Sequence, residues 1–206
     1  MTEQFTGTEA EYLSMLEADY FAVCKDQTVL EIGPLNGYHS KLIVKNTPEH
    51  FEVIEPHKGE ASRDLQSIAG IDKIIVDDAL LFLSVPRPYS VVVCFGVLYH
   101  LHSPIHLLEL IASHCRPKYV LLDSVGEFDA GMPDSAVFHD EAVNQPGTRQ
   151  VSTDFKFSGL KIMCPGSVIQ VAMNRLGYEL VKSCNLNVTD HFSKSNSWMA
   201  LWKIKE

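Results

Sequence analysis

Long apolar runs and basic clusters are both missing from this chain, and each absence excludes a class of protein. No stretch approaches the roughly 20 apolar residues that a membrane-spanning helix needs. Acidic residues outnumber basic ones by 26 to 17, for a net charge of −9, whereas proteins that bind nucleic acid through its phosphates present basic patches. The sequence therefore predicts no membrane association and makes nucleic acid an unexpected partner.

Targeting signals and paired cysteines are missing too. The first 24 residues contain no lysine or arginine, which argues against a secretory signal and an arginine-rich transit peptide. The five cysteines are scattered, odd in number and free of any C-x-x-C pair, a pattern typical of reduced thiols rather than of a disulfide framework or a zinc site. We expect a cytoplasmic protein with no metal site. A length of 206 residues, 46% of them apolar, suits a single domain over 1–206.

Apolar runs of strand length alternate with helical patterns from Thr28 onward, which indicates βαβ units on a parallel sheet. The strands expected in this alternation are Thr28–Ile32, Phe51–Glu55, Lys73–Val76, Ser90–Phe95 and Tyr119–Asp123. Helices are expected over Tyr38–Lys45, Lys58–Ala69, a segment with Ser103 as N-cap and Pro104 at its first position, and Ser167–Leu176. Two closing strands, Tyr178–Asn185 and Trp198–Ile204, are predicted to form an antiparallel hairpin at the sheet edge.

Two segments fall outside this alternation. Residues 1–27 are expected to form an N-terminal helical cap, with one aromatic-rich face made of Tyr12, Leu13, Leu16 and Tyr20. Packing against the sheet and contact with a substrate explain that face equally well. Residues 125–164 are rich in glycine, proline and phenylalanine, and we expect them to form a partly packed lid over an acceptor, because long loops in compact domains usually serve a function.

The segment Val29–Tyr38 reads as a buried strand that runs into a glycine-hinged turn. Gly33 and Gly37 can take backbone angles that other residues resist, and they let a ligand lie against the main chain. The dinucleotide fingerprint G-x-G-x-x-G needs a second glycine where Pro34 and Leu35 stand. The pattern therefore argues against an NAD-type oxidoreductase.

Acidic residues follow the next two expected strands. In an open parallel sheet the ligand lies outside the carboxyl ends of the strands. Glu55 ends the second strand, where a carboxylate can accept hydrogen bonds from both hydroxyls of a ribose. Asp77 and Asp78 follow the third strand, where one carboxylate can accept from an adenine amine while the other caps the following helix. This order predicts a nucleoside site.

Two further features belong to the same edge. Glu31 lies inside an apolar strand, where an unpaired carboxylate is costly, so we expect it to accept a hydrogen bond or to meet an ammonium group of the ligand. The segment Phe95–His100 (FGVLYH) follows the fourth strand. Its apolar groups can flank a ring, and its polar groups can face a reacting centre.

The order and spacing of these motifs over residues 28–204 resemble the class I, Rossmann-like, S-adenosylmethionine (SAM)-dependent methyltransferases. The resemblance implies an α/β fold with a seven-stranded, mostly parallel sheet in the order 3-2-1-4-5-7-6, an antiparallel last strand and helices on both faces. It implies SAM as cofactor and S-adenosylhomocysteine (SAH) as its product. The residues that it assigns to the cofactor are Glu31, Gly33, Gly37, Glu55, Asp77, Asp78 and Phe95.

A narrower resemblance joins Gly37-Tyr38-His39 and Phe95–His100, continued by Ser103-Pro104, to the tRNA wobble-uridine carboxymethyltransferase family. It implies that Pro56-His57 lie with Glu55 at the ribose and that Tyr99 lies nearest the transferred group. In that family two basic residues follow the Tyr-His pair, whereas here Leu101 and His102 stand there. We therefore expect plain SAM and a small-molecule acceptor, with a tRNA-modifying enzyme as the alternative.

The catalytic residues are less sharply indicated than the cofactor residues. Methyl transfer from a sulfonium needs mainly alignment and desolvation, and a base where the acceptor carries a proton. We predict Tyr99 and His100 as catalytic residues, with His102 and then His139 as further candidates for the base. Asp140-Glu141 could bind a metal, but no ligand spacing supports one. A catalytically idle SAM-binding protein and a homodimer both stay open.

Overall fold

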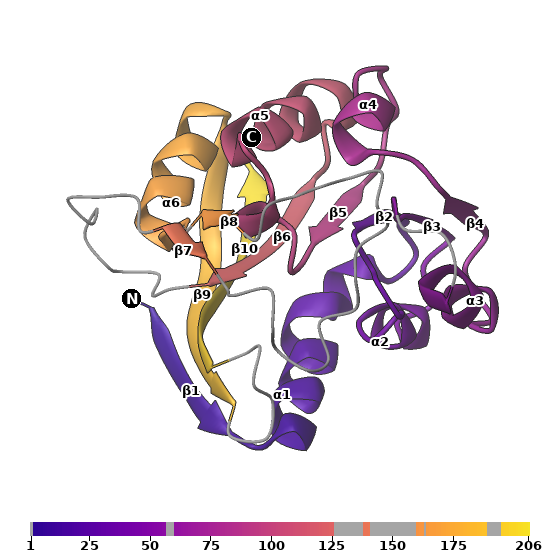
Figure 1. Ribbon diagram of the computed structural model, residues 1–206, viewed down its shortest axis with the longest axis horizontal. Helices are drawn as coiled ribbons and strands as arrows, with labels where there is room; N and C mark the ends of the chain where they lie inside the picture. Colours follow the sequence, from indigo (N-terminus) through magenta and orange to yellow (C-terminus); the bar gives the residue numbers. More distant parts are fainter. Residues whose placement is uncertain (1, 57–59, 126–137, 141–159, 163, 189–194) are drawn as a thin grey trace.

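The computed structural model describes residues 2–56, 60–125, 138–140, 160–162, 164–188 and 195–206. The main sheet consists of β1 (Glu3–Gly7), β2 (Thr28–Ile32), β3 (His50–Ile54), β4 (Lys73–Ile75), β5 (Val91–Cys94), β6 (Tyr119–Val125), β9 (Tyr178–Val188) and β10 (Ser195–Ile204). The helices are α1 (Glu9–Met15), α2 (Ser40–Lys45), α3 (Glu60–Gln66), α4 (Ala79–Leu83), α5 (Pro104–Leu110) and α6 (Gly166–Arg175). In Figure 1, α4, α5 and α6 lie on one side of the sheet, and α1, α2 and α3 lie on the other.

The strand order is β1-β9-β10-β6-β5-β2-β3-β4. The strands from β4 to β6 are parallel to their neighbours, and β10 is antiparallel to both β6 and β9. Counted from β2 onward, this is the predicted order 3-2-1-4-5-7-6, so the fold class and the antiparallel closing hairpin are confirmed.

The sheet has eight strands, and the prediction of seven was wrong. The additional strand, β1, pairs in parallel with β9, so that Glu3 faces Cys184. β1 therefore forms the edge of the sheet, and the predicted edge position of the closing hairpin was wrong. β1 lies in the segment that we expected to be entirely helical. Its five residues, EQFTG, carry no clear apolar alternation, and its partner is distant in sequence, so the local pattern could not reveal the pairing.

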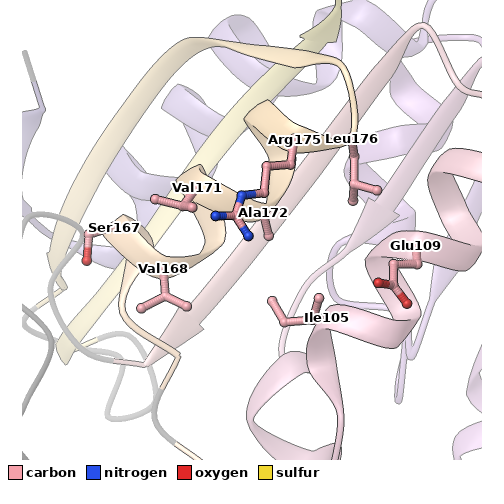
Figure 2. Close-up of a pocket in the computed structure, with 8 residues that line it drawn as sticks. All are labelled: Ile105, Glu109, Ser167, Val168, Val171, Ala172, Arg175 and Leu176. Carbon is pink, nitrogen blue, oxygen red and sulfur yellow. The ribbon is translucent and has the colours of Figure 1, made fainter.

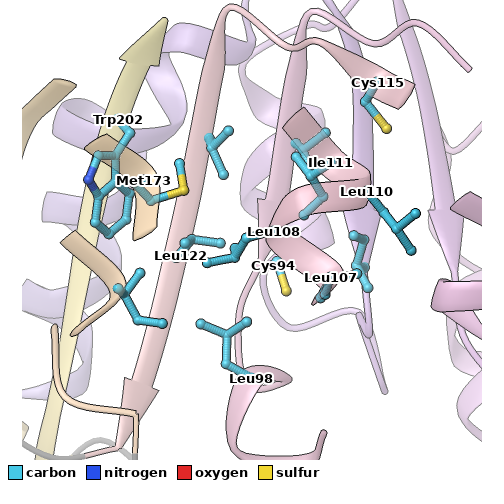
Figure 3. Close-up of a cluster of buried hydrophobic side chains, with 14 of the residues drawn as sticks. Cys94, Leu98, Leu107, Leu108, Leu110, Ile111, Cys115, Leu122, Met173 and Trp202 are labelled. Carbon is cyan, nitrogen blue, oxygen red and sulfur yellow. The ribbon is translucent and has the colours of Figure 1, made fainter. Parts of the chain in front are cut away.

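Side chains on the central strands alternate between two cores. On β5, Val92 and Cys94 join the core on the side of α4, α5 and α6. Val91 and Val93 join the core on the side of α1, α2 and α3. Figure 3 shows the first core, in which side chains from the α5 region pack against those of β5 and β6. A strand buried on both faces explains why its sequence is apolar throughout.

The N-terminal segment continues from β1 into a capped helix. The Thr8 amide donates to Glu11 at 2.8 Å and the Glu11 amide donates to the Thr8 hydroxyl at 3.4 Å, which together form a capping box. α1 then passes into the π-helical turn η1 (Leu16–Tyr20) and the 3₁₀ turn η2 (Phe21–Cys24). Tyr12, Leu16 and Tyr20 are buried in the second core. The aromatic-rich face is therefore used for packing.

Part of the predicted lid is described. β7 (Phe138–Asp140) and β8 (Leu160–Ile162) form an antiparallel pair, and β8 lies beside the 3₁₀ turn η3 (Leu98–His100). Residues 126–137, 141–159 and 163 lie outside the described part of the chain, so the lid stays a prediction. Within the described ranges, no helix is long and apolar enough to cross a membrane.

The cysteines are all free and buried, as expected of reduced thiols. Burial raises the pKa of the Cys115 thiol to about 12 and the pKa values of Cys164 and Cys184 to about 11. Because the thiolate is the reactive form, these residues act as small apolar side chains. Within the described residues, no group of three or more His, Cys, Asp and Glu side chains could hold a metal ion.

Candidate functional site

The predicted glycine turn lies at the carboxyl end of β2. Gly33 has a φ of +70°, and its amide donates to the Ile54 carbonyl of β3 at 2.9 Å. A Cβ at this position would overlap the Val97 side chain, which follows β5. Gly37 has a φ of +77°, and a Cβ there would overlap Ile68. Both predicted glycines are therefore required, by backbone angle and by space.

Glu55 is joined to this turn. Its side chain is only 2% exposed, and its Oε2 accepts the Leu35 amide at 2.9 Å. Leu35 itself has a φ of +53° and is 56% exposed. The sequence did not indicate this hydrogen bond, because it depends on a positive φ at Leu35, and a positive φ is uncommon for leucine. The bond holds the ends of β2 and β3 together around one carboxylate.

Glu31 lies beneath the same turn with 1% of its surface exposed. The Ser40 hydroxyl at the start of α2 donates to Glu31 Oε2 at 2.5 Å, which confirms the expected hydrogen bond. Burial raises the pKa of Glu31 to about 8, the bond from Ser40 lowers it, and the charge of Glu55 raises it further. The two glutamates therefore lie close enough to interact.

One of the two aspartates after β4 caps the following helix, as predicted. Asp78 caps α4, because its Oδ1 accepts the Leu81 amide at 3.0 Å. Asp77 accepts the Asp78 amide at 2.8 Å through Oδ1, and a carboxylate has the capacity to accept further bonds. The neighbouring Val76 is 41% exposed, and the contact of Asp77 with an adenine stays a prediction. The helix beginning at Pro104 differs from expectation, since Ser103 makes no side-chain cap bond.

The segment after β5 brings together Gly96, Tyr99 and a residue that the sequence analysis missed. Gly96 has a φ of +74°, and its amide donates to Asp123 Oδ1 at the carboxyl end of β6. A Cβ on Gly96 would lie 3.6 Å from the Tyr99 hydroxyl. Asp123 is 1% exposed. A buried acid near the end of an apolar strand was the available signal, and it is the same signal that identified Glu31.

The remaining predicted residues lie less centrally. Phe95 is buried against His39 and Phe21, with ring centroids 5.1 and 5.7 Å away, so its predicted contact with the cofactor stays a prediction. His100 is exposed, and its ring lies 4.3 Å from that of Tyr99. His102 is exposed on the following loop. His139 belongs to β7, and the structure does not describe its side chain. His57 lies outside the described residues.

Two surface grooves lie away from this edge. One, of about 450 Å³, runs between α5 and α6 and is shown in Figure 2; it is lined by Ile105, Glu109, Ser167, Val168, Val171, Ala172, Arg175 and Leu176. The other, of about 650 Å³, is lined by Ala10, Leu13, Ser14, Glu17, Ala18, Ala22, Leu42, Lys45 and Asn46. Neither groove includes a residue predicted to bind the cofactor or to act in catalysis.

The residues at the carboxyl edge fit SAM. Its ribose hydroxyls, adenine amine and ammonium group are all hydrogen-bond donors, and Glu55, Asp77 and Glu31 are all acceptors when ionised. The glycine turn leaves its backbone open to close approach, because a Cβ at Gly33 would overlap Val97. The charges that these acidic residues carry when ionised are thus opposite in sign to those of the sulfonium and ammonium groups of the cofactor.

Comparison with known proteins agrees with this geometry. A family model described as a methyltransferase domain matches residues 14–182, which is well over half of the chain. No curated protein matches the chain in sequence. The match covers the glycine turn, the acidic strand ends and the segment after β5.

Solved structures reproduce the fold across nearly the whole chain. A candidate SAM-dependent methyltransferase from Listeria monocytogenes has a TM-score of 0.69 at 10% identity, covering 96% of this chain and 100% of its own. The N-methyltransferase NodS from Bradyrhizobium japonicum WM9, crystallised with SAH, has a TM-score of 0.64 at 15% identity, with 96% and 88% covered. The mitomycin 7-O-methyltransferase MmcR has a TM-score of 0.60 at 16% identity, with 95% and 53% covered. The chain therefore belongs to the methyltransferase domain family and has the class I fold of enzymes that use SAM as methyl donor.

Proposed function

We propose that this enzyme transfers the methyl group of SAM to a small-molecule acceptor at the carboxyl edge of β2 to β5. The observation that carries the proposal is the junction of Glu55 with the glycine turn. A buried carboxylate is costly unless hydrogen bonds compensate for its lost hydration, and here the Leu35 amide supplies one of them. The junction places acceptor oxygens directly beside a backbone segment that leaves room for a ligand.

Each residue has a role that follows from its chemistry. Glu55 accepts from the ribose hydroxyls, Asp77 accepts from the adenine amine, and Glu31 faces the ammonium group. Bound SAM supplies an activated methyl group on its sulfonium sulfur. Tyr99, whose hydroxyl lies beside Gly96, aligns the acceptor with that methyl group, and excluding water and fixing the geometry are the main contributions of the protein.

Charge and exposure support a small acceptor. The chain carries a net charge of −9, the described residues of the site are acidic, and Leu101 and His102 replace the basic pair of the tRNA-modifying family. His100 is the first candidate for a base, because its ring lies beside that of Tyr99, at an interplanar angle of 47°, and histidine is the side chain that commonly acts as a base. The free, buried cysteines support a cytoplasmic setting.

A tRNA-modifying role is the second candidate, and one observation favours it. The last three residues of the FGVLYH segment, Leu98–His100, form the turn η3 at the proposed transfer edge, as expected if the motif has kept its function. A third candidate is a protein that binds SAM without turning it over. Following SAM consumption with a panel of small acceptors and with bulk tRNA separates the three, because each predicts turnover with a different addition or with none.

Replacement of Glu55 tests the cofactor site. Glu55→Gln keeps an acceptor for the Leu35 amide but removes the charge, and hydrogen bonds to charged groups contribute about 1.5–3 kcal/mol. We expect SAH affinity, measured by calorimetry, to fall by at least about tenfold. Glu52→Gln is the matched control, because Glu52 lies in β3, which ends just before Glu55, and accepts from Tyr89 away from the turn. Unchanged SAH affinity in Glu55→Gln, or tight NADH binding without SAH binding, would contradict the proposal.

A further inference from the structure

The helix α6 carries apolar residues on two of its faces. Ile169 and Met173 point inward and are buried in the first core. Val168, Val171 and Ala172 follow one another at helical spacing on another face, and Val171 is 54% exposed. A surface helix normally presents polar residues on the side that faces away from the core. The second apolar face, which we call the α6 stripe, therefore indicates a contact beyond the core.

The α6 stripe forms one wall of the groove of about 450 Å³ between α5 and α6. Ile105 of α5 and Leu176 at the end of α6 extend its apolar lining, so that five of the eight lining residues are apolar. Exposed apolar patches that are bordered by polar residues commonly mark interaction surfaces. The groove thus has the composition of a contact surface, with an apolar centre and a polar border.

Two residues of opposite charge lie on the two sides of this groove. In Figure 2, Arg175 projects from α6 and Glu109 projects from α5, and both are exposed. Among the described residues, Glu109 Oε2 lies 3.4 Å from His106 Nδ1, in an exposed pair of the kind that contributes little to stability. One acid and one base leave the groove neutral, although the whole chain has a net charge of −9.

These two charges decide which partner fits the groove. A wholly anionic partner would bring like charge against Glu109, and a wholly cationic one would bring like charge against Arg175, which is unfavourable. The fitting surface has a base over Glu109, an acid over Arg175 and an apolar centre. The groove itself has this arrangement when it is rotated by half a turn about an axis between the two residues, because the rotation exchanges their positions. Two-fold interfaces are self-complementary in this way.

We propose that the groove between α5 and α6 is the contact surface of a two-fold homodimer, in which Arg175 of each subunit lies opposite Glu109 of the partner subunit. The α6 stripe lies at the centre, where removal of apolar area from water stabilises the dimer, and the charge pairs fix the orientation of the two copies. The proposal does not depend on the proposed function, because no residue of the groove is predicted to bind the cofactor or to act in catalysis.

A substitution in the α6 stripe tests the apolar centre. Analytical ultracentrifugation of the full chain, from micromolar to millimolar concentration, should show a monomer–dimer equilibrium. Val171→Asp should weaken dimerisation at least about tenfold, because it places an unpaired charge in an apolar contact. Val85→Asp is the matched control, since Val85 is also 54% exposed but lies outside the groove. The control should leave the dimer dissociation constant unchanged.

Charge reversal tests the two-fold arrangement. Glu109→Arg and Arg175→Glu each set like charges against each other at both ends of the dimer, and each should weaken dimerisation at least about tenfold. The two variants change the net charge in opposite directions, so a general charge effect would move their dissociation constants in opposite directions. An equal mixture of the two variants should form dimers again, because every base then faces an acid.

Three results would overturn the proposal. The first is a chain that stays monomeric at millimolar concentration. The second is a dimer that Val171→Asp and both charge reversals leave unchanged, which would place the interface on another surface. The third is a mixture of the two reversed variants that stays as monomeric as either variant alone, which would show that the groove binds no second copy in this orientation. Circular dichroism and the Tm of each variant confirm beforehand that it is folded.

Discussion

Glu31 shows how a single buried group links the site to the stability of the fold. Its carboxyl group is 1% exposed and is bonded to the Ser40 hydroxyl. Because burial disfavours the charged form, the pKa of Glu31 is raised to about 8, and the group is largely protonated at neutral pH. A cation brought beside it, such as the ammonium group of the proposed cofactor, favours the ionised form. Ligand binding is therefore expected to release a proton.

The raised pKa predicts a pH-dependent stability. A raised folded-state pKa contributes stability that is complete below the unfolded value of about 4.5 and is lost as the pH rises through about 8. Glu31→Gln removes this dependence and keeps an acceptor for Ser40. As the pH rises across that window, the unfolding free energy of the variant should therefore increase relative to that of the wild type, by up to about 1.4 kcal/mol per pKa unit. Urea denaturation at both ends of the window checks it, and parallel pH profiles of the wild type and the variant would show that folding does not raise the pKa of Glu31.

Two glycines with positive φ allow the cost of backbone strain to be measured separately from the cost of steric overlap. Gly177, with a φ of +88°, has no atom within 4 Å of a Cβ built on it, whereas a Cβ on Gly33 would overlap Val97. Gly177→Ala should lower the unfolding free energy by about 1–2 kcal/mol through strain alone. Gly33→Ala should lower it more and also weaken SAH binding. Urea denaturation measures the stability of both variants, and calorimetry measures their SAH affinity. If both variants lost the same stability and Gly33→Ala kept its SAH affinity, the turn would be able to accommodate a Cβ.

At the scale of an element, α4 shows how adjacent aspartates divide two tasks. Asp78 caps the helix by accepting the Leu81 amide at 3.0 Å, while Asp77 is proposed to face the ligand. Asp78→Ala should lower the unfolding free energy by about 1 kcal/mol and leave SAH affinity nearly unchanged. Asp77→Asn should do the reverse. Thermal unfolding and SAH calorimetry on both variants test these roles. If Asp78→Ala weakened SAH binding and Asp77→Asn lowered the stability, the two roles would be exchanged.

Elements defined by local signals were predictable, and those defined by a partner were not. β5 was predicted because its residues are apolar and β-branched in one run. α6 was predicted because its apolar residues repeat at helical spacing and Gly177 follows its end. β1 was missed because its pairing with β9 depends on contacts between distant residues.

At the scale of the whole molecule, one sheet separates two cores, and we predict that both belong to a single domain. Leu121 and Leu122 are adjacent in β6, are both 0% exposed and point into opposite cores. Leu121→Ala and Leu122→Ala should each lower the unfolding free energy by about 2–5 kcal/mol. Both should shift the transitions followed by circular dichroism and by tryptophan fluorescence together.

The two tryptophans allow the unfolding of one core to be followed separately from that of the other. Trp198 and Trp202 lie in the core that contains Leu122 and not in the core that contains Leu121. If Leu121→Ala lowered the circular dichroism midpoint while the fluorescence midpoint stayed in place, the two faces would unfold separately, and the prediction of a single domain would be wrong.

The sequence by itself determined the alternation of strands and helices from β2 onward, the glycine turn and the acids at the strand ends. These follow from local periodicity, from the steric needs of glycine and from the cost of burying carboxylates, all of which act within a few residues. Only the tertiary structure decided that the Leu35 amide donates to Glu55 and that the Gly96 amide donates to Asp123. Those pairs join separate elements, and their distances depend on how the whole sheet twists and packs. The residues proposed to bind the cofactor can therefore be identified from the local sequence, whereas the residues around the acceptor can be identified only from the fold.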